Sequence, residues 1–392
     1  MSKVIHDPNL RIVFGVTLMA VMGVASITPA FPAIMEQFRL EPQDVGILIT
    51  AFTLPGIVLT PLLGILADRL GRKVILVPSL LLFGLAGVAI TLVRDFHLVV
   101  MLRVVQGVGA TSLGLLNVTL IGDLFEPRRR PEAMGYNASV LSLGVATYPA
   151  IGGVLSGIAW YAPFYLPLLS VAVALVVAFR LELPAVVKNP NTAQYFRNTW
   201  KNMNRAPVWL LFAMNILMFV ILYGTLLSFF PILMRQRYRA PEWQIGIYMS
   251  IFSVATAIVS SQLKRVTAVI GVRLQLVVSL VMYATGQALL PMVHNVWLLL
   301  VPVAIFGAGH GLLFPAIQTL LVGMAPMQER AVFMSINSMV LRVGQTLGPV
   351  LMGMLFVVGG LEWVYFGGAL VSGLMLLLWL MFRVPRSVAD RE

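Results

Sequence analysis

Three side chains that carry a positive charge, or can acquire one, lie inside long apolar stretches of the sequence: Arg103, His310 and Arg342. An arginine at the centre of a membrane helix costs at least about 2.5–3.5 kcal/mol, so such residues are usually kept for a partner or a function. A guanidinium can bind an anionic group, and imidazole titrates near neutral pH, which suits a proton carrier. The candidate chemistries are therefore anion binding and proton binding.

Arg103 begins a polar stripe, because Gln106, Ala110 and Asn117 follow it on the same helical face. A stripe of this kind favours a position facing the protein interior. The alternative is an arginine whose stem lies along apolar surface while its charged end reaches the membrane interface.

Arg342 and His310 lie near the middle of their apolar stretches. Arg342 is too deep to reach the interface easily, so we expect it to face a central cavity together with Gln345. His310 lies between Gly309 and Gly311. Two interpretations of His310 stay open: a buried neutral histidine with one hydrogen bond, or a proton carrier.

All 15 carboxylates lie at the ends of apolar stretches or in loops. A cavity that binds cations needs an acid at depth, and the sequence offers none there. We therefore expect a neutral or positively charged cavity, and neutral or anionic amphipathic substrates in preference to cationic dyes.

The elements that hold these residues follow from composition. The chain has 392 residues, of which 59% are hydrophobic and 11% charged, with a mean hydropathy of +0.93. Soluble domains carry about 25% charged residues. The sequence therefore predicts an all-α membrane protein with twelve transmembrane helices, near 11–35, 45–67, 73–94, 97–122, 132–158, 161–181, 207–234, 243–264, 272–292, 295–322, 331–357 and 361–383.

Charge sets the expected orientation. Most of the 27 Lys and Arg residues fall on the side of the N-terminus, which predicts that both termini are cytoplasmic in a bacterial-type inner membrane. This asymmetry explains the net charge of +12 without a nucleic-acid partner. The chain has no cysteine, which excludes disulfides and thiolate chemistry.

The two halves resemble a repeat with a constant offset of 200 residues. The offset maps Arg39 to Arg239, Gly71 to Gly271 and Pro149 to Pro349. Matches of this kind inside helices indicate shared backbone features. We expect two six-helix pseudo-repeats, at residues 1–181 and 207–392, joined by a cytoplasmic linker at residues 182–206.

A charged loop joins the second and third expected spans and reads Gly64-Ile-Leu-Ala-Asp68-Arg69-Leu-Gly71-Arg72-Lys73. It resembles the G-x-L-x-D-R-x-G-R-K loop of the major facilitator superfamily. The stretch around Arg103, Gln106 and Gly107 is similar to the family's fourth-span motif. The resemblance implies the major facilitator fold and transport by alternating access. It also implies a conformational gate, to which we assign Gly64, Asp68, Arg69, Gly71, Arg72, Asp123, Arg128 and Arg330.

The fifth span resembles the G-x-x-x-G-P-x-x-G-G pattern of the family's antiporter branch, but Tyr148 replaces its second glycine. Tyr148 either narrows the cavity or reaches a ligand, or it packs at a lipid-facing bend. The overall resemblance is closest to the twelve-span drug/proton antiporters. It implies proton-coupled efflux of small amphipathic compounds. The alternative is a transporter of a lipid, sugar or organic anion with a positively charged cavity.

The residues expected to contact substrate or protons are Arg103, Gln106, Asn117, Asn137, Tyr148, His310, Arg342 and Gln345. No His/Asp/Glu cluster has the spacing of metal ligands, and no G-x-x-x-x-G-K-[ST] loop for ATP occurs. We therefore expect neither an enzyme nor a bound cofactor or metal. The expected partners are the lipid bilayer, protons and a small-molecule substrate, and the expected assembly is a monomer.

Overall fold

The computed structural model describes residues 4–183, 204–325 and 330–381. Nearly all of them are helical, and none of these residues forms a strand, which confirms the all-α fold class. The described chain divides into two compact units, each treated by itself. The first holds the described residues within Met1–Glu41, Ile47–Asn189 and Pro241–Gly246, and the second holds those within Pro42–Gly46, Pro190–Ala240 and Ile247–Glu392.

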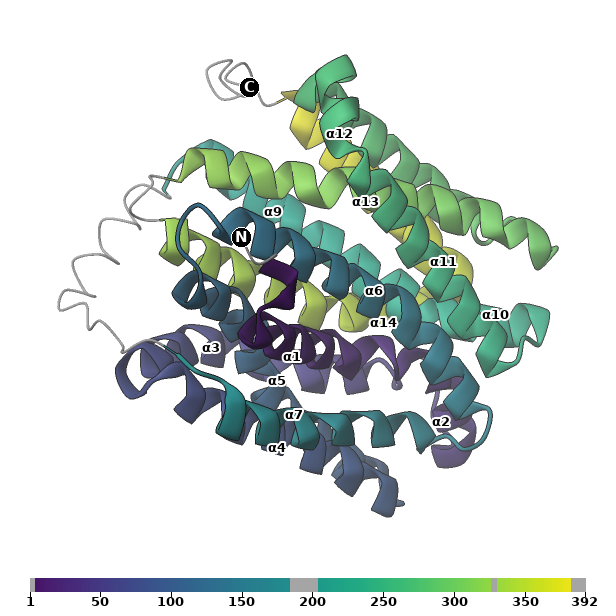
Figure 1. Ribbon diagram of the computed structural model, residues 1–392. Coiled ribbons are helices and arrows are strands. Elements are labelled where there is room, and N and C mark those ends of the chain that lie inside the picture. The colour runs from purple at the N-terminus through teal and green to yellow at the C-terminus, as the bar shows by residue number, and fades with distance from the viewer. Residues whose placement is uncertain (1–3, 184–203, 326–329, 382–392) are drawn as a thin grey trace. The chain divides into compact units, whose positions relative to one another are not determined.

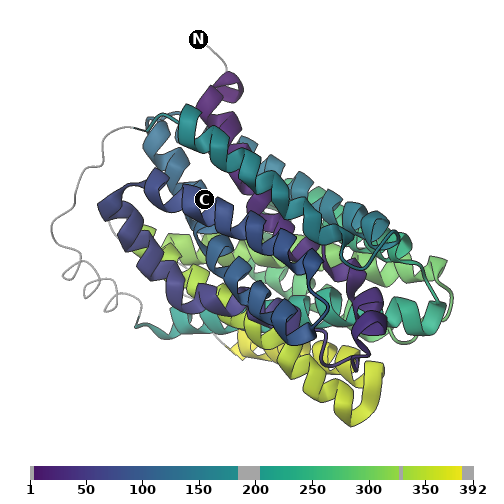
Figure 2. The same cartoon turned by 90° about the horizontal axis from the view of Figure 1, so that it is seen from below.

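The first unit is a bundle of long apolar helices. In it α4 packs against α5 and α7, and α1 packs against α5, α6 and α7. Figures 1 and 2 both show α7 alongside α4. The helices are α1 (Pro8–Ala25), α2 (Phe31–Phe38), α3 (Ile47–Leu70), α4 (Arg72–Leu92), α5 (Phe96–Leu124), α6 (Arg130–Ser156) and α7 (Leu169–Arg180), with 3₁₀ turns η1 (Val4–His6), η2 (Thr28–Ala30) and η3 (Ala162–Leu168).

The second unit is also a helical bundle, in which α12 packs against α13 and α14, and α14 packs against α9. Its elements are α9 (Ala206–Ile221), the π-helix η4 (Leu222–Phe229), α10 (Phe230–Tyr238), most of α11 (Glu242–Ser261), α12 (Leu263–Leu289), the 3₁₀ turn η5 (Trp297–Leu299), α13 (Leu300–Met324) and α14 (Arg330–Met381).

Within the described residues, eleven helices are long and apolar enough to cross a membrane. Twelve spans were expected. The difference lies in α14, which contains both the eleventh and the twelfth expected spans, joined by a tight turn at two glycines. Its backbone leaves helical geometry only at Gly359 and Gly360. These two glycines separate two helices within α14 at the position of the expected hairpin, and the count of eleven treats those two helices as one.

The first and seventh expected spans contain interruptions that apolar patterning did not predict. The first is broken around η2, where Pro29 and Pro32 each lack a backbone N–H donor. The seventh passes through the π-helix η4, a form found mostly as short insertions in α-helices and often at functional sites.

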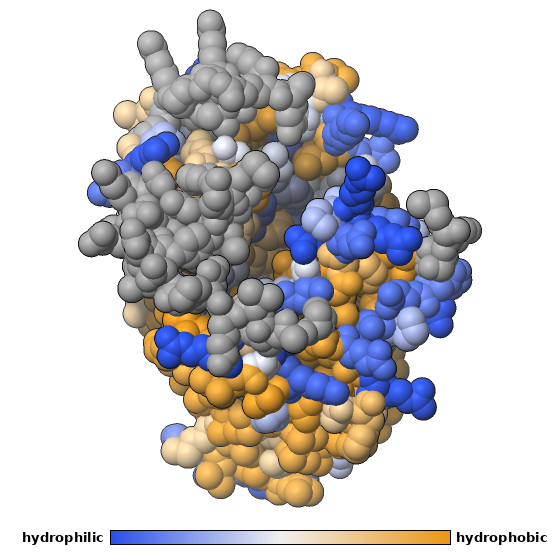
Figure 3. Space-filling view, turned by 60° about the vertical axis from the view of Figure 1, so that its left-hand side comes forward, coloured by the Kyte–Doolittle hydropathy of each residue, from blue (hydrophilic) through white to orange (hydrophobic). Residues whose placement is uncertain are grey.

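Many large apolar side chains are exposed on the surface. Val269 is 83% exposed, Phe179 81% and Met381 79%. On the face drawn in Figure 3, hydrophobic residues form broad continuous areas, and hydrophilic residues gather in separate patches. Patches of this size do not persist in water and indicate contact with lipid. With the eleven apolar helices, they describe a multi-pass membrane protein.

Candidate functional site

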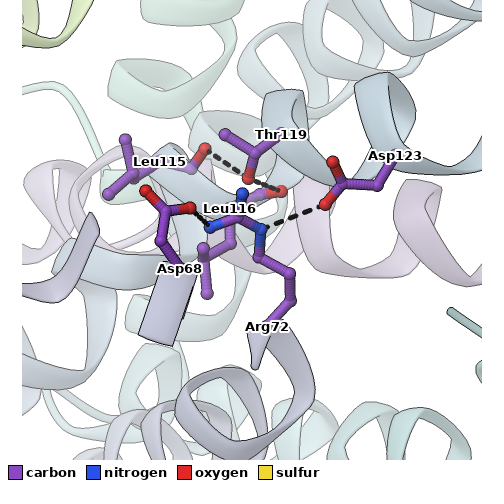
Figure 4. Close-up of polar contacts among 6 residues, drawn as sticks. All are labelled: Asp68, Arg72, Leu115, Leu116, Thr119 and Asp123. Carbon is purple, nitrogen blue, oxygen red and sulfur yellow. Dashed lines mark hydrogen bonds and ion pairs between the residues drawn. The ribbon is translucent and has the colours of Figure 1, made fainter. Parts of the chain in front are cut away.

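The charged loop forms a compact cluster at the α3–α4 turn. Gly71 lies between the two helices with φ of +103°, a conformation that L side chains rarely adopt. The turn places Arg72 beside Asp68, with which it forms an ion pair, and the Nε of Arg72 donates to Oδ2 of Asp123 at 3.0 Å. Figure 4 shows the Arg72 side chain reaching both carboxylates. The cluster therefore ties together α3, α4 and the end of α5.

Partial burial distinguishes this cluster from an ordinary surface ion pair. The side chain of Arg72 is only 16% exposed, whereas Asp68 is 62% and Asp123 38% exposed. A guanidinium presents several donors in a fixed plane, so one arginine can hold two carboxylates. Asp68 is the more exposed partner, and it is available for a further contact.

The remaining expected gate residues play different parts. A Cβ at Gly64 would lie 3.3 Å from Leu115 Cδ2, so this glycine allows α3 to approach α5 closely. Arg69 and Arg128 are exposed, and neither forms an ion pair or side-chain hydrogen bond with another described residue. The side chain of Arg330 lies outside the described residues.

Arg103 is 1% exposed and stays inside the first unit. Its Nε donates to the carbonyl of Leu48 at 3.1 Å, and its Nη1 donates to the carbonyl of Gly23 at 2.9 Å and to Gln106 Oε1 at 2.7 Å. The guanidinium also lies 4.3 Å from the ring centroid of Phe52. Backbone carbonyls and one aromatic ring thus solvate this charge, and the side chain joins α5 to α1 and α3.

Two buried amide chains run through the cores of the units. In the first, Thr17 donates to Asn137 Oδ1 at 2.6 Å, and Asn137 Nδ2 donates to Asn117 Oδ1 at 3.2 Å. The sequence indicated both asparagines but not Thr17, which in an apolar span carries no distinguishing signal.

The second unit has its own chain around Asn337, the residue 200 positions after Asn137. Asn215 Nδ2 donates to Asn337 Oδ1 at 2.8 Å, and Asn337 Nδ2 donates to Gln318 Oε1 at 2.8 Å. The buried Oδ1 of Asn215 has no hydrogen-bond partner.

His310 is 8% exposed and lies among aromatic rings of the second unit. Its Nδ1 is 2.7 Å from the hydroxyl of Tyr283. The rings of Phe219, Phe252 and Phe314 have their centroids 6.5, 5.8 and 5.9 Å from that of the imidazole. Sequence reasoning missed Tyr283, because nothing in the pattern of α12 distinguishes its hydroxyl from the surrounding apolar side chains.

Arg342 is partly buried in α14. Its Nη1 lies 3.5 Å from Gln345 Oε1, which is a long hydrogen bond, and it interacts electrostatically with Tyr223 of η4. No carboxylate among the described side chains forms an ion pair with it. This guanidinium is thus less fully engaged than that of Arg103. Tyr148 of α6 is 7% exposed.

The structure brings several expected residues together in pairs: Asp68 and Asp123 through Arg72, Arg103 with Gln106, Asn117 with Asn137, and Arg342 with Gln345. His310 has a partner that was not expected. No group of three or more His, Cys, Asp or Glu side chains suited to a metal occurs in the part of the chain that the structure describes.

Comparison with known proteins agrees with this architecture. The family model of the Major Facilitator Superfamily matches residues 13–261 and 223–392. Multidrug resistance protein 1 of Bacillus subtilis (strain 168) is 26% identical over 352 residues, which is 89% of this chain and 90% of that protein. Quinolone resistance protein NorA of Staphylococcus aureus (strain Mu50 / ATCC 700699) is 29% identical over 145 residues, 37% of each chain.

A solved structure shares the fold over almost the full length. It is the crystal structure of a bacterial homolog of the human lysosomal transporter Spinster, in an inward-facing and unoccupied conformation. The match has a TM-score of 0.77 at 16% sequence identity, and it covers 97% of this chain and 96% of that one.

Proposed function

We propose that this chain, which belongs to the Major Facilitator Superfamily, exports small amphipathic compounds in exchange for protons. The relationship to Multidrug resistance protein 1, which extends over most of both chains, supports efflux of small molecules. The excess of Lys and Arg on one side of the predicted spans supports a location of both termini in the cytoplasm, at a bacterial-type inner membrane. The protein acts as a monomer and performs no chemical conversion of its cargo.

The mechanism that we infer is alternating access, in which the halves 1–181 and 207–392 rock about a site near the membrane midplane. The observation that carries this inference is the Asp68–Arg72–Asp123 cluster. Its charges are only partly buried, so they can form and break contacts at moderate cost. Arg72 holds Asp68 in place, and the exposed carboxylate then stabilises one facing state of the transporter.

Substitution of Asp68 tests this role. Asp68→Asn keeps the size of the side chain but removes the charge that Arg72 pairs with, so it should shift the conformational equilibrium and slow transport several-fold in proteoliposomes. Membrane insertion and monodispersity in detergent should stay as in the wild type. The matched control is Glu126→Gln, which changes an exposed carboxylate near the same loops. Unchanged transport by Asp68→Asn would refute the gating role.

A second candidate cargo is an organic anion, and Arg342 favours it. A guanidinium in a membrane-spanning helix is costly unless something compensates its charge. The described partners of Arg342 are a long hydrogen bond to Gln345 and an electrostatic interaction with Tyr223. An anionic group of the substrate would supply the missing compensation.

A panel of probes separates the two cargoes. Ethidium serves as the cation, norfloxacin as the zwitterionic quinolone and carboxyfluorescein as the anion, each assayed with and without a pH gradient. If Arg342 binds the anion, Arg342→Ala should lower carboxyfluorescein flux at least about tenfold, which corresponds to 1.4 kcal/mol. Arg342→Lys should recover part of it, because lysine keeps the charge but not the planar fork. The exposed Lys264→Ala is the control, and intact flux in Arg342→Ala removes Arg342 from the site.

A further inference from the structure

His310 occupies a closed aromatic surrounding to which four helices of the second unit contribute. Phe219 comes from α9, Phe252 from α11, Tyr283 from α12 and Phe314 from His310's own helix, α13. The Phe314 ring is parallel to the imidazole within 4°. Aromatic faces attract cations, so these rings favour a planar group that gains positive charge.

We propose that His310 is the residue that binds the coupled proton and that Tyr283 positions it, a proposal that rests on the proton exchange proposed above. A histidine and a tyrosine would then do what a membrane-embedded carboxylate does in other proton-coupled proteins. The spans of this chain hold no carboxylate at depth, so the task falls to the group that titrates nearest neutral pH.

No charged side chain of the described helices that surround His310 lies close to it, so the imidazole is the group that accepts the proton. α9 and α13 contain no charged residue. α11 carries only Glu242, at its first position, and the nearest charge to Tyr283 on α12 is Arg273, ten residues or about 15 Å of helix away. The ring of Tyr223 lies 5.8 Å, centroid to centroid, from that of Phe219, and it is Tyr223 that interacts with Arg342.

The hydroxyl of Tyr283 can serve both charge states of the imidazole. In the tautomer with its hydrogen on Nδ1, the ring donates this hydrogen to the Tyr283 oxygen both when it is neutral and when it is an imidazolium. The incoming proton then adds at Nε2, to which no described residue forms a hydrogen bond. The balance is one proton taken from water and held on the ring, with no other bond formed or broken.

Burial supplies the link to transport. Desolvation disfavours the imidazolium, so the ring takes up a proton from water in the facing state that hydrates it, and it gives the proton to water on the other side when the conformational change makes the imidazolium unfavourable. The proposal requires that hydration of this surrounding differ between the two facing states of the alternating-access cycle. Protonation of His310 is therefore coupled to the conformational change, and no buried carboxylate is needed for this coupling.

Two measurements on the full chain test the assignment. The first is the pH titration of the ring resonances of protein labelled with ¹³C-histidine in nanodiscs. The chain has only 4 histidines, so His310→Gln identifies the signal. We expect the His310 signal to titrate. In Tyr283→Phe its midpoint should move to lower pH by about one unit, because a charge-assisted hydrogen bond is lost. A signal that stays neutral throughout, or a midpoint unmoved by Tyr283→Phe, overturns the proposal.

The second measurement is norfloxacin transport in proteoliposomes. His310→Gln should lose at least tenfold of the accumulation driven by a pH gradient, while exchange of norfloxacin without a gradient stays within twofold of the wild type. His97→Gln, which changes an exposed histidine, should behave as the wild type. Gradient-driven accumulation that survives in His310→Gln, or exchange that is lost with it, overturns the assignment. A wild type indifferent to the gradient instead refutes the proposed proton exchange, while the titration still decides whether His310 binds a proton.

Discussion

Arg39 and Arg239 end α2 and α10 with φ of 53° and 51°, and they are the two non-glycine residues with positive φ in the described chain. The same offset of 200 residues relates Gly71 to Gly271, both with positive φ. It also relates Gly107 to Gly307, which lie against the carbonyls of Phe52 and Phe252, where a Cβ would not fit. The two units therefore share their turns and closest helix contacts, so these backbone features define the repeat.

The side chains at equivalent positions differ. Arg103 corresponds to Val303, and Arg72 corresponds to Val272. In the opposite direction, His310 corresponds to Ala110 and Arg342 to Ser142. The first unit uses its buried and half-buried arginines to join its own helices. The second unit places a titratable ring and a less engaged guanidinium on the same framework, and we propose on this ground that the first repeat is mainly a scaffold and the second binds ligands.

Arg103 gives the largest expected contrast. Arg103→Ala removes the charged donor that the carbonyls of Gly23 and Leu48 share, and hydrogen bonds to charged groups contribute about 1.5–3 kcal/mol each. We expect the free energy of unfolding to fall by about 3–5 kcal/mol in a mixed-micelle denaturation assay. Val303→Ala at the equivalent position should cost only about 1–2 kcal/mol. Equal losses would contradict a scaffolding role for Arg103.

Substitution of Gly71 and of Gly271 gives a second comparison of the two units, with a smaller expected loss of stability. Neither has an atom within 4 Å of an added Cβ, so alanine at either position brings strain through the backbone alone, of about 1–3 kcal/mol. The loss of stability should thus be similar in both variants. Only Gly71→Ala should also slow transport, because Gly71 positions the Arg72 that holds Asp68. Transport lowered equally by both variants would show that the charged cluster has no special part.

The sequence predicts the fold well because its signals are strong and local. Apolar length marks the spans, and the glycine, proline and asparagine matches mark the repeat. It predicts the pair of Asp68 and Arg72 for the same reason, since these residues are four positions apart across one short turn. It does not predict Tyr283 beside His310, because that contact joins α12 to α13 across 27 residues of apolar sequence. The sequence also does not predict which carbonyls accept hydrogen bonds from Arg103, because every residue has a backbone carbonyl.

The two amide chains provide the finest comparison. In Asn137→Ala the hydroxyl of Thr17 keeps its hydrogen bond to the carbonyl of Val13, at 3.0 Å, so this hydroxyl is not left without a partner. Asn337→Ala instead removes the one acceptor described for the Asn215 side chain, whose own Oδ1 already lacks a partner.

An unpaired buried polar group costs about 1–3 kcal/mol, so Asn337→Ala should destabilise the protein by about 1 kcal/mol more than Asn137→Ala in the mixed-micelle assay. A double-mutant cycle of Asn215→Ala with Asn337→Ala isolates the pair, and it should return a coupling energy of about 1 kcal/mol. A coupling near zero, or a larger cost for Asn137→Ala, would mean that the second unit tolerates unpaired amides, as expected of a core that hydrates during the transport cycle.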